Sequence, residues 1–476
     1  MTGEFSEDQL VEQPAIGLFS SLGWRTASGI DEALGHGGTL GRETSGDVVL
    51  VSQLRVAMER LNPQLPLEAF GNAVDDLTRD RSAMSLPAAN REVYLLLKEG
   101  IRVSVVDTEP SPQPSPRGRG SDESTPHPAP LPDRGGEGGR GGQKTERVRV
   151  IDWEHPENND FLLVSQLSVT GALYTCRPDL VGFVNGLPLV VIELKKPGVP
   201  ARAAFDENLT SYKHPQNGIP ALFVFNALLI ASNGTDSRVG SITADWERFF
   251  EWKRIEREDE PRRVSLEMMI RGTCDKTRLL DLVENFTLFS EHKAGLVKII
   301  GQNHQFLGVN NAIASMLEAR KLGHGRGGVF WQTQGSGKSF SMVFFAQKVL
   351  RKMPGNWTFV VATDRVELDV QIAKTFKACG AVSEAEGDQC HASSGAHLRE
   401  LLRGNHRYVF TLIHKFRPET PSSPALLPEG EGGGSQQYRA GCNTRDCWRR
   451  HVNSRGNRHQ QRMSLGSCCA TGASRG

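Results

Sequence analysis

The stretch RPDLVGFVNGLPLVVIELKKPG, residues 177–198, contains side chains suited to phosphodiester chemistry. Asp179 opens it, and Glu193 and Lys195 lie two residues apart in its second apolar run. Alternate residues of a strand share a face, so Glu193 and Lys195 are expected to point the same way. The Asn-Gly pair between the two runs predicts a hairpin that brings Asp179 beside Glu193. Two carboxylates and a backbone carbonyl suit Mg²⁺, and a lysine beside them can orient or deprotonate water, which indicates metal-assisted hydrolysis.

The same residues also fit a plainer structure. A D…ExK spacing arises often by chance, and a salt bridge at a strand edge, from Asp179 or Glu193 to Lys195 or Lys196, would explain it. The surroundings favour the catalytic interpretation. The hairpin is followed by ARAAFDENLTSYKH, interpreted as a helix, and by ALFVFNALLIASNG, interpreted as a strand.

A second site is predicted in residues 327–350, GGVFWQTQGSGKSFSMVFFAQKVL, interpreted as a strand, a glycine-rich turn and a helix. In such a loop the backbone N–H groups wrap a phosphate, a lysine neutralises the β- and γ-phosphates, and a hydroxyl reaches Mg²⁺. Gln332 stands where the strict phosphate-loop pattern has its first glycine. A Gly-Lys-Ser turn without a ligand is the alternative. The predicted nucleotide-binding residues are Thr333, Gly335, Ser336, Gly337, Lys338 and Ser339, with Ser339 also facing Mg²⁺.

The order hairpin, helix, strand resembles the core of PD-(D/E)xK nucleases, an α/β fold. Asp179, Glu193 and Lys195 match the motif of that family residue by residue. Some of these nucleases also carry a Gln-x-x-x-Tyr pair on the following helix; Tyr212 fits the tyrosine, whereas Asn208 stands at the glutamine position. An acid on a preceding helix is often present as well, and Glu92 is a candidate, although a solvated helix face explains it equally well.

The turn T-x-G-x-G-K-S resembles motif I of superfamily 2 helicases. NWTFVVATDRVELDVQIAKTF resembles the next motif, in which loop residues such as Arg365 touch the DNA backbone, and RYVFTLIHKF resembles the one after it. These enzymes use a glutamine upstream of the loop to bind adenine. Gln305 stands in that place, with a surface glutamine as the alternative interpretation.

Together these motifs resemble the restriction (R, motor) subunit of type I restriction–modification enzymes over about residues 5–416. The resemblance implies an ATP-driven translocase of double-stranded DNA joined to a Mg²⁺-dependent endonuclease, acting with modification and specificity subunits. Two alternatives stay open. The first alternative is a nuclease that acts alone, and the second is a non-enzymatic remnant that binds the modification subunits.

Composition sets the expected domain boundaries. We expect a PD-(D/E)xK domain over residues 1–255, interrupted by a disordered Pro/Gly-rich insert at 109–142, and a helical connector over 256–290. An incomplete RecA-like lobe is expected over 291–417. Residues 418–476 lose all periodicity and read like codons out of frame, with a natural disordered tail as the alternative. No Walker B acid or second lobe is recognisable after Lys415, so the sequence predicts truncation within the first lobe and an inactive motor.

Bulk properties exclude several classes of protein. The formal net charge is +1, so contacts with DNA must come from local basic patches. No apolar run approaches the roughly 20 residues of a membrane helix, and the N-terminus lacks a signal-peptide core, which predicts a cytoplasmic protein without a membrane partner. Four cysteines are scattered like reduced thiols. The other four, Cys442, Cys447, Cys468 and Cys469, have no usual zinc spacing.

Overall fold

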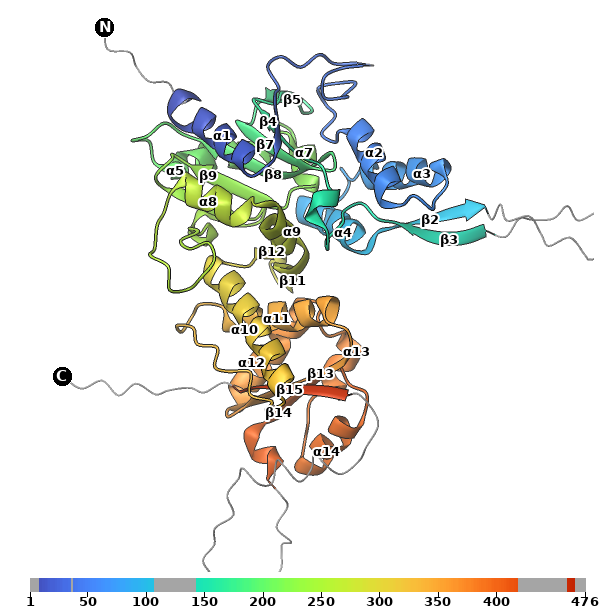
Figure 1. Ribbon diagram of the computed structural model, residues 1–476, viewed down its shortest axis with the longest axis vertical. Helices are drawn as coiled ribbons and strands as arrows, with labels where there is room; N and C mark the ends of the chain where they lie inside the picture. Colours follow the sequence, from blue (N-terminus) through green and yellow to red (C-terminus); the bar gives the residue numbers. More distant parts are fainter. Residues whose placement is uncertain (1–7, 36, 107–142, 418–459, 467–476) are drawn as a thin grey trace, which may run out of the picture. The chain divides into compact units, whose positions relative to one another are not determined.

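The computed structural model describes residues 8–35, 37–106, 143–417 and 460–466 (Figure 1). The chain divides into two compact units: Met1–Ile255 with Glu260–Glu284, and Glu256–Asp259 with Asn285–Gly476. Each is a mixture of helices and strands, as predicted. The predicted insert at 109–142 lies outside the described residues.

The first unit is built on a mixed six-stranded sheet. Its two central strands, β7 and β8, form an antiparallel hairpin, while β8 runs parallel to β9 and β1 parallel to β4. Every residue of β7, β8 and β9 is buried. In spatial order the strands are β1 (Arg25–Ser28), β4 (Phe161–Ser165), β7 (Leu180–Val184), β8 (Leu187–Leu194), β9 (Leu228–Ser232) and β10 (Ser237–Gly240).

Helices flank this sheet, and their ends agree with the sequence signals. A π-helical turn, Asp8–Glu12, leads into α1 (Gln13–Ser21), and α4 (Leu86–Glu99) ends at Gly100, where φ is 80°. Figure 1 shows α1 and α8 in front of the strands. The other helices are α2 (Val51–Leu61), α3 (Leu67–Thr78), α7 (Pro220–Val224), α8 (Leu266–Thr273) and α9 (Lys276–Asn285), with β2 (Ile101–Val106) and β3 (Gln143–Val148) as a separate antiparallel ribbon.

The β7–β8 turn confirms the predicted hairpin. Asn185 and Gly186 both have positive φ, 50° and 80°, which is the backbone twist that a two-residue hairpin turn needs. A Cβ atom at Gly186 would come within 2.5 Å of the carbonyl oxygen of Leu50, so glycine also allows the close approach of this loop. The turn pairs Val184 with Leu187, and an irregularity between Gly182 and Phe183 shifts the register by one residue, so that Leu180 lies opposite Ile192.

One predicted strand is partly wrong. The segment 201–212 is helical as expected, in three consecutive pieces, Ala201–Ala203 (α5), Ala204–Leu209 (η3) and Thr210–Tyr212 (α6). Of the following apolar run, however, Pro220–Val224 is helix α7, and strand β9 begins only at Leu228. Pro220 suits the first turn of a helix, and the side chain of Asn226 bonds the carbonyl oxygens of Leu189 and Leu228, which fixes the change of direction between the two elements.

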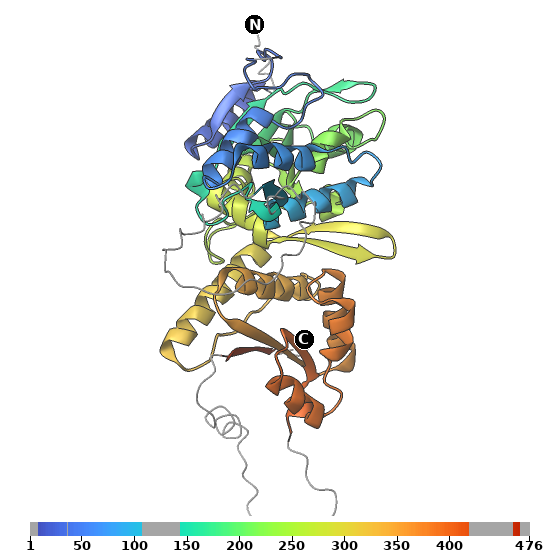
Figure 2. The same ribbon diagram turned by 90° about the vertical axis from the view of Figure 1, so that its right-hand side faces the viewer.

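The second unit holds a parallel three-stranded sheet and the helices around it. The hairpin of β11 (Thr287–His292) and β12 (Gly295–Ile300), drawn in yellow in Figure 2, precedes the long helix α10 (Asn303–Leu322). The remaining elements are α11 (Lys338–Lys352), β13 (Asn356–Thr363), α12 (Val366–Ala378), α13 (Glu384–Gln389), α14 (Gly395–Arg403), β14 (Tyr408–Leu412) and β15 (Gln460–Gly466).

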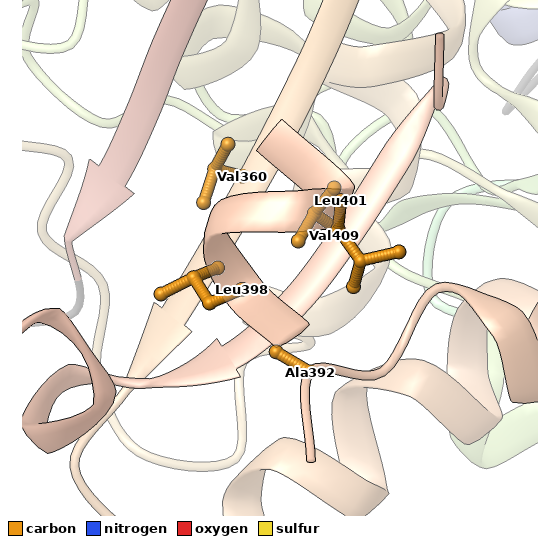
Figure 3. Close-up of a cluster of buried hydrophobic side chains, with 5 residues drawn as sticks. All are labelled: Val360, Ala392, Leu398, Leu401 and Val409. Atoms are coloured by element: carbon orange, nitrogen blue, oxygen red, sulfur yellow. The ribbon is translucent and has the colours of Figure 1, made fainter. Parts of the chain in front are cut away.

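Helices cover both faces of this sheet. Tyr408 and Phe410 of β14 meet Phe376 of α12 edge-on, whereas Val409, between them, belongs to a buried cluster with Leu398 and Leu401 of α14 (Figure 3). Because successive strand residues point to opposite faces, α12 and α14 lie on opposite sides of β14. This is the layering of a doubly wound α/β fold.

Two predictions for this unit are wrong. Residues 325–333 contain no strand, and Val329 and Trp331 are 89% and 77% exposed. A strand needs a neighbour for its backbone hydrogen bonds, and none of the described strands pairs with this segment. Conversely, Gln460–Gly466, within the tail predicted to lack structure, is strand β15, which pairs in parallel with Asn356–Ala362 because that edge of β13 offers unpaired backbone groups. The rest of the tail lies outside the described residues.

Candidate functional site

The hairpin brings the two predicted acids together. The backbone N–H of Asp179 donates to Oε1 of Glu193 at 3.3 Å, and Oδ2 of Asp179 accepts from the N–H of Leu194 at 2.7 Å. The carboxylate of Glu193 is therefore bonded to the backbone of Asp179, and the carboxylate of Asp179 is bonded to the backbone of Leu194, the residue after Glu193. Their oxygen atoms converge on the carboxyl end of β8.

The environment of Glu193 is unfavourable for an unaccompanied negative charge. The residue is 1% exposed, and burial, followed by the nearby charge of Asp179, raises the pKa of its carboxyl well above the usual value. The donor set consists of hard carboxylate oxygens, which suit Mg²⁺, and a divalent cation there would offset both effects. In the described part of the chain no group of three or more His, Cys, Asp or Glu side chains is arranged to hold a metal. Further ligands would thus be backbone carbonyls or water.

The predicted lysine and tyrosine belong to one hydrogen-bonded chain. Nζ of Lys195 donates to Oδ1 of Asn208 at 2.8 Å, and Nδ2 of Asn208 donates to the hydroxyl of Tyr212 at 3.2 Å. Lys195 is also 3.4 Å from the exposed carboxylate of Glu207. Burial and the charge of Glu193 raise the pKa of Tyr212, so this phenol stays protonated. Asn208, which departs from the glutamine of the motif, links the lysine to the tyrosine.

Glu92, the candidate acid on a preceding helix, forms ion pairs on its own side of the unit. Its carboxylate is bonded to the guanidinium groups of Arg79 and Arg81, which explains its position on α4. Glu12, at the start of the first helix, is 7% exposed and accepts from Nε2 of Gln166 at 2.9 Å. The same Nε2 lies 3.3 Å from Oδ1 of Asp179.

Sequence reasoning missed both Glu12 and Gln166. The available signal for Glu12 was its place beside the apolar helical positions Val11, Ala15 and Phe19, all of which are buried. A carboxylate next to such a face is rarely buried without a partner. No comparable signal marks Gln166, which follows the end of β4.

The phosphate loop has the backbone of a ligand cradle. Gly335 and Gly337 both have a φ of 79°, a conformation that favours glycine, and α11 starts at Lys338. The loop residues Thr333 and Lys338 are exposed. Ser336 bonds the carbonyl oxygen of Thr333 at 2.7 Å, which closes the turn. The first N–H groups of a 15-residue helix, with the Lys338 and Ser339 side chains, form an anion-binding end that fits the phosphates of ATP.

Helix α10 braces this loop. Nε2 of Gln305 donates to the carbonyl oxygen of Gly337 at 3.0 Å, and Oε1 accepts from the N–H of Gln302 at 2.9 Å. His304 bonds the carbonyl oxygen of Ser336 at 3.0 Å. The side chain of Gln305 is 4% exposed and bonded at both ends, so contact with adenine would require one of these bonds to open.

Arg365 directly precedes α12. Its side chain is 63% exposed, and its Nε lies 3.6 Å from the carboxylate of Asp364, so it is accessible after the end of β13. No helix in the described residues is long and apolar enough to cross a membrane.

Comparisons with known proteins match a family model to part of each unit. Residues 4–113 and 137–248 match the model for the type I restriction enzyme R protein N terminus, and residues 304–437 match the SWI2/SNF2 ATPase model. The HindI endonuclease subunit of Haemophilus influenzae is 35% identical over 416 residues, which cover 85% of this chain and 36% of that subunit. The putative MjaIXP endonuclease subunit of Methanocaldococcus jannaschii is 28% identical over 87% of this chain and 38% of its own length. The chain thus spans just over a third of the length of these relatives.

Proposed function

Because this chain belongs to the family of type I restriction enzyme R proteins, we propose that its first unit is a Mg²⁺-dependent DNA endonuclease domain of the PD-(D/E)xK type. The observation that carries the proposal is the approach of Asp179 to buried Glu193, with Lys195 directly after the end of β8. A bound cation and a positive group at the phosphate both accelerate hydrolysis of a phosphodiester, and these residues supply the means for both.

The residues have distinct roles in this proposal. Asp179 and Glu193 would hold Mg²⁺, which would supply charge stabilisation and lower the pKa of a nearby water. Lys195 points its ammonium at the scissile phosphate and orients the attacking water. Asn208 and Tyr212 hold Lys195 in place through their shared hydrogen bonds.

We further propose that the second unit is a RecA-like lobe that binds ATP with Mg²⁺. Lys338 would neutralise the β- and γ-phosphates, the hydroxyl of Ser339 would serve the Mg²⁺ of the nucleotide, and Gln305 keeps the loop closed. In the assembled enzyme, ATP hydrolysis drives movement along double-stranded DNA, and the modification and specificity subunits select the site.

Nicking of supercoiled plasmid by the full chain, with and without Mg²⁺, tests the nuclease proposal. We expect Mg²⁺-dependent nicking that falls about 10²–10³-fold in Asp179→Ala and Lys195→Ala. Lys196→Ala removes the neighbouring lysine and is expected to keep most of the activity.

Equal activity of the parent and Asp179→Ala would contradict the proposed site. The assay is repeated with the modification and specificity subunits of the same system. Nicking that appears only with these subunits supports a nuclease that depends on partners, whereas nicking without them supports one that acts alone.

A further inference from the structure

Gln166 holds an unusual backbone conformation beside the nuclease site. It follows the last residue of β4, and its φ is 53°, in the left-handed region that residues other than glycine seldom adopt. Its N–H donates to the carbonyl oxygen of Asp179 at 2.8 Å, so the conformation is held by the sheet. Gly29 packs against the same turn: a Cβ there would lie 2.8 Å from the carbonyl oxygen of Gln166. Backbone strain that persists at a site is a reason to look for function.

The side chain of Gln166 lies between two acids. Nε2 is 2.9 Å from Oε2 of Glu12 and 3.3 Å from Oδ1 of Asp179. An ionised carboxylate only accepts hydrogen bonds, so the NH₂ end of the amide, with its two hydrogens, is the end that can satisfy both. Glu12 therefore fixes which way the amide of Gln166 faces.

Asp179 is thus oriented through both of its oxygens. Oδ2 is fixed by the N–H of Leu194 and Oδ1 by Gln166. A carboxylate oxygen carries two lone pairs, so an oxygen that accepts a hydrogen bond can also act as a ligand to a cation. Partners of this kind set the direction and basicity of metal-binding groups.

We propose that Gln166 is a positioning residue of the nuclease site: oriented by Glu12, its amide holds Asp179 in the rotamer that binds Mg²⁺. This rests on the proposed nuclease function. In this proposal Glu12 acts through Gln166, with which it shares a hydrogen bond of 2.9 Å. The chain Glu12–Gln166–Asp179 connects the first helix to the metal site across 154 positions of sequence.

Mg²⁺ binding to the full chain, measured by titration calorimetry, and the Mg²⁺ dependence of nicking test this proposal. Gln166→Met keeps the length of the side chain and removes the amide. We expect the Mg²⁺ dissociation constant and the Mg²⁺ concentration for half-maximal nicking to rise about tenfold. The rate at saturating Mg²⁺ should change little. In Glu12→Gln the side chain at position 12 can donate as well as accept, so the amide of Gln166 can flip. We expect the Mg²⁺ dissociation constant and the Mg²⁺ concentration for half-maximal nicking to rise in this variant too, but by less than in Gln166→Met.

Gln166→Gly separates the side chain from the backbone, since glycine adopts the positive φ without strain. The proposal expects it to weaken Mg²⁺ binding as much as Gln166→Met while melting at a higher temperature than that variant. Gln216→Met, at an exposed glutamine of the same unit, serves as the control and should match the parent. Unchanged Mg²⁺ binding in both Gln166 variants, with only a lower melting temperature, would show that Gln166 stabilises the fold and does not position a metal ligand. If Asp179→Ala also binds Mg²⁺ like the parent, the proposed nuclease site itself is wrong.

Discussion

The carboxyl of Glu193 is subject to two opposed demands. Burial on a central strand favours its neutral form, while binding a cation requires its charged form. A carboxyl whose pKa is raised on folding keeps its proton at a pH where the unfolded chain has lost it. The folded state then binds more protons than the unfolded state, so this group lowers the stability of the metal-free protein as pH rises from about 4.5 through the raised pKa.

Replacing Glu193 by glutamine should therefore stabilise the metal-free first unit. We expect Glu193→Gln to melt at a higher temperature than the parent at pH 8 in the presence of EDTA, with the difference shrinking toward pH 5. Mg²⁺ should raise the melting temperature of the parent more at pH 8 than at pH 6, and that of the variant hardly at all. Scanning calorimetry over this pH range checks both expectations. Glu247→Gln, at an exposed glutamate, is the control, and a parent whose response to Mg²⁺ does not change with pH would contradict the explanation.

At the scale of elements, local signals decided what the sequence could predict. The β7–β8 hairpin was predictable because alternation and an Asn-Gly turn are encoded within a few residues, and α4 because a glycine ends it. The failures depend on distant partners. Residues 325–333 have strand-like residues but no described neighbour, and β15 owes its conformation to the open edge of β13. The Glu12–Gln166 bond joins residues too far apart in sequence for any spacing rule to find.

The brace between α10 and the phosphate loop yields a prediction about the nucleotide site. Gln305→Glu keeps an oxygen for the N–H of Gln302 but loses the donor to Gly337 and sets a negative charge against a carbonyl oxygen. We expect affinity for a fluorescent ATP analogue to fall about tenfold, since a lost hydrogen bond of about 1 kcal/mol is joined by repulsion of the phosphates. Asn311→Glu adds the same charge at an exposed position of the same helix and should bind like the parent. Equal affinity in all three proteins would show that the brace does not serve the nucleotide.

At the scale of the whole molecule, two sites lie in two units with separate sheets. A ligand that binds only the folded form of one unit stabilises that unit by mass action, by about 2.7 kcal/mol at a hundred times its dissociation constant. One family model matches each unit, and the described hydrogen bonds that shape each candidate site lie within its own unit.

Ligands should consequently act on different transitions of the full chain. In calorimetry we expect Mg²⁺ alone to raise the unfolding temperature of the first unit, and a non-hydrolysable ATP analogue with Mg²⁺ to raise that of the second, each by a few degrees. Asp179→Ala should abolish the first response and keep the second, and Lys338→Ala should do the reverse. A single transition that shifts as one with either ligand would mean that the units unfold together.

The exposed segment before the phosphate loop has an optical consequence. Trp331 is 77% exposed, whereas Trp24, Trp252 and Trp357 are each below 5%. An indole in contact with water emits at longer wavelengths than a buried one and collides freely with dissolved iodide. Trp331 stands two positions before Thr333, so one quenchable, red-shifted contribution to the intrinsic fluorescence originates beside the candidate nucleotide site. The chain therefore carries its own fluorophore where the phosphates of a nucleotide would bind.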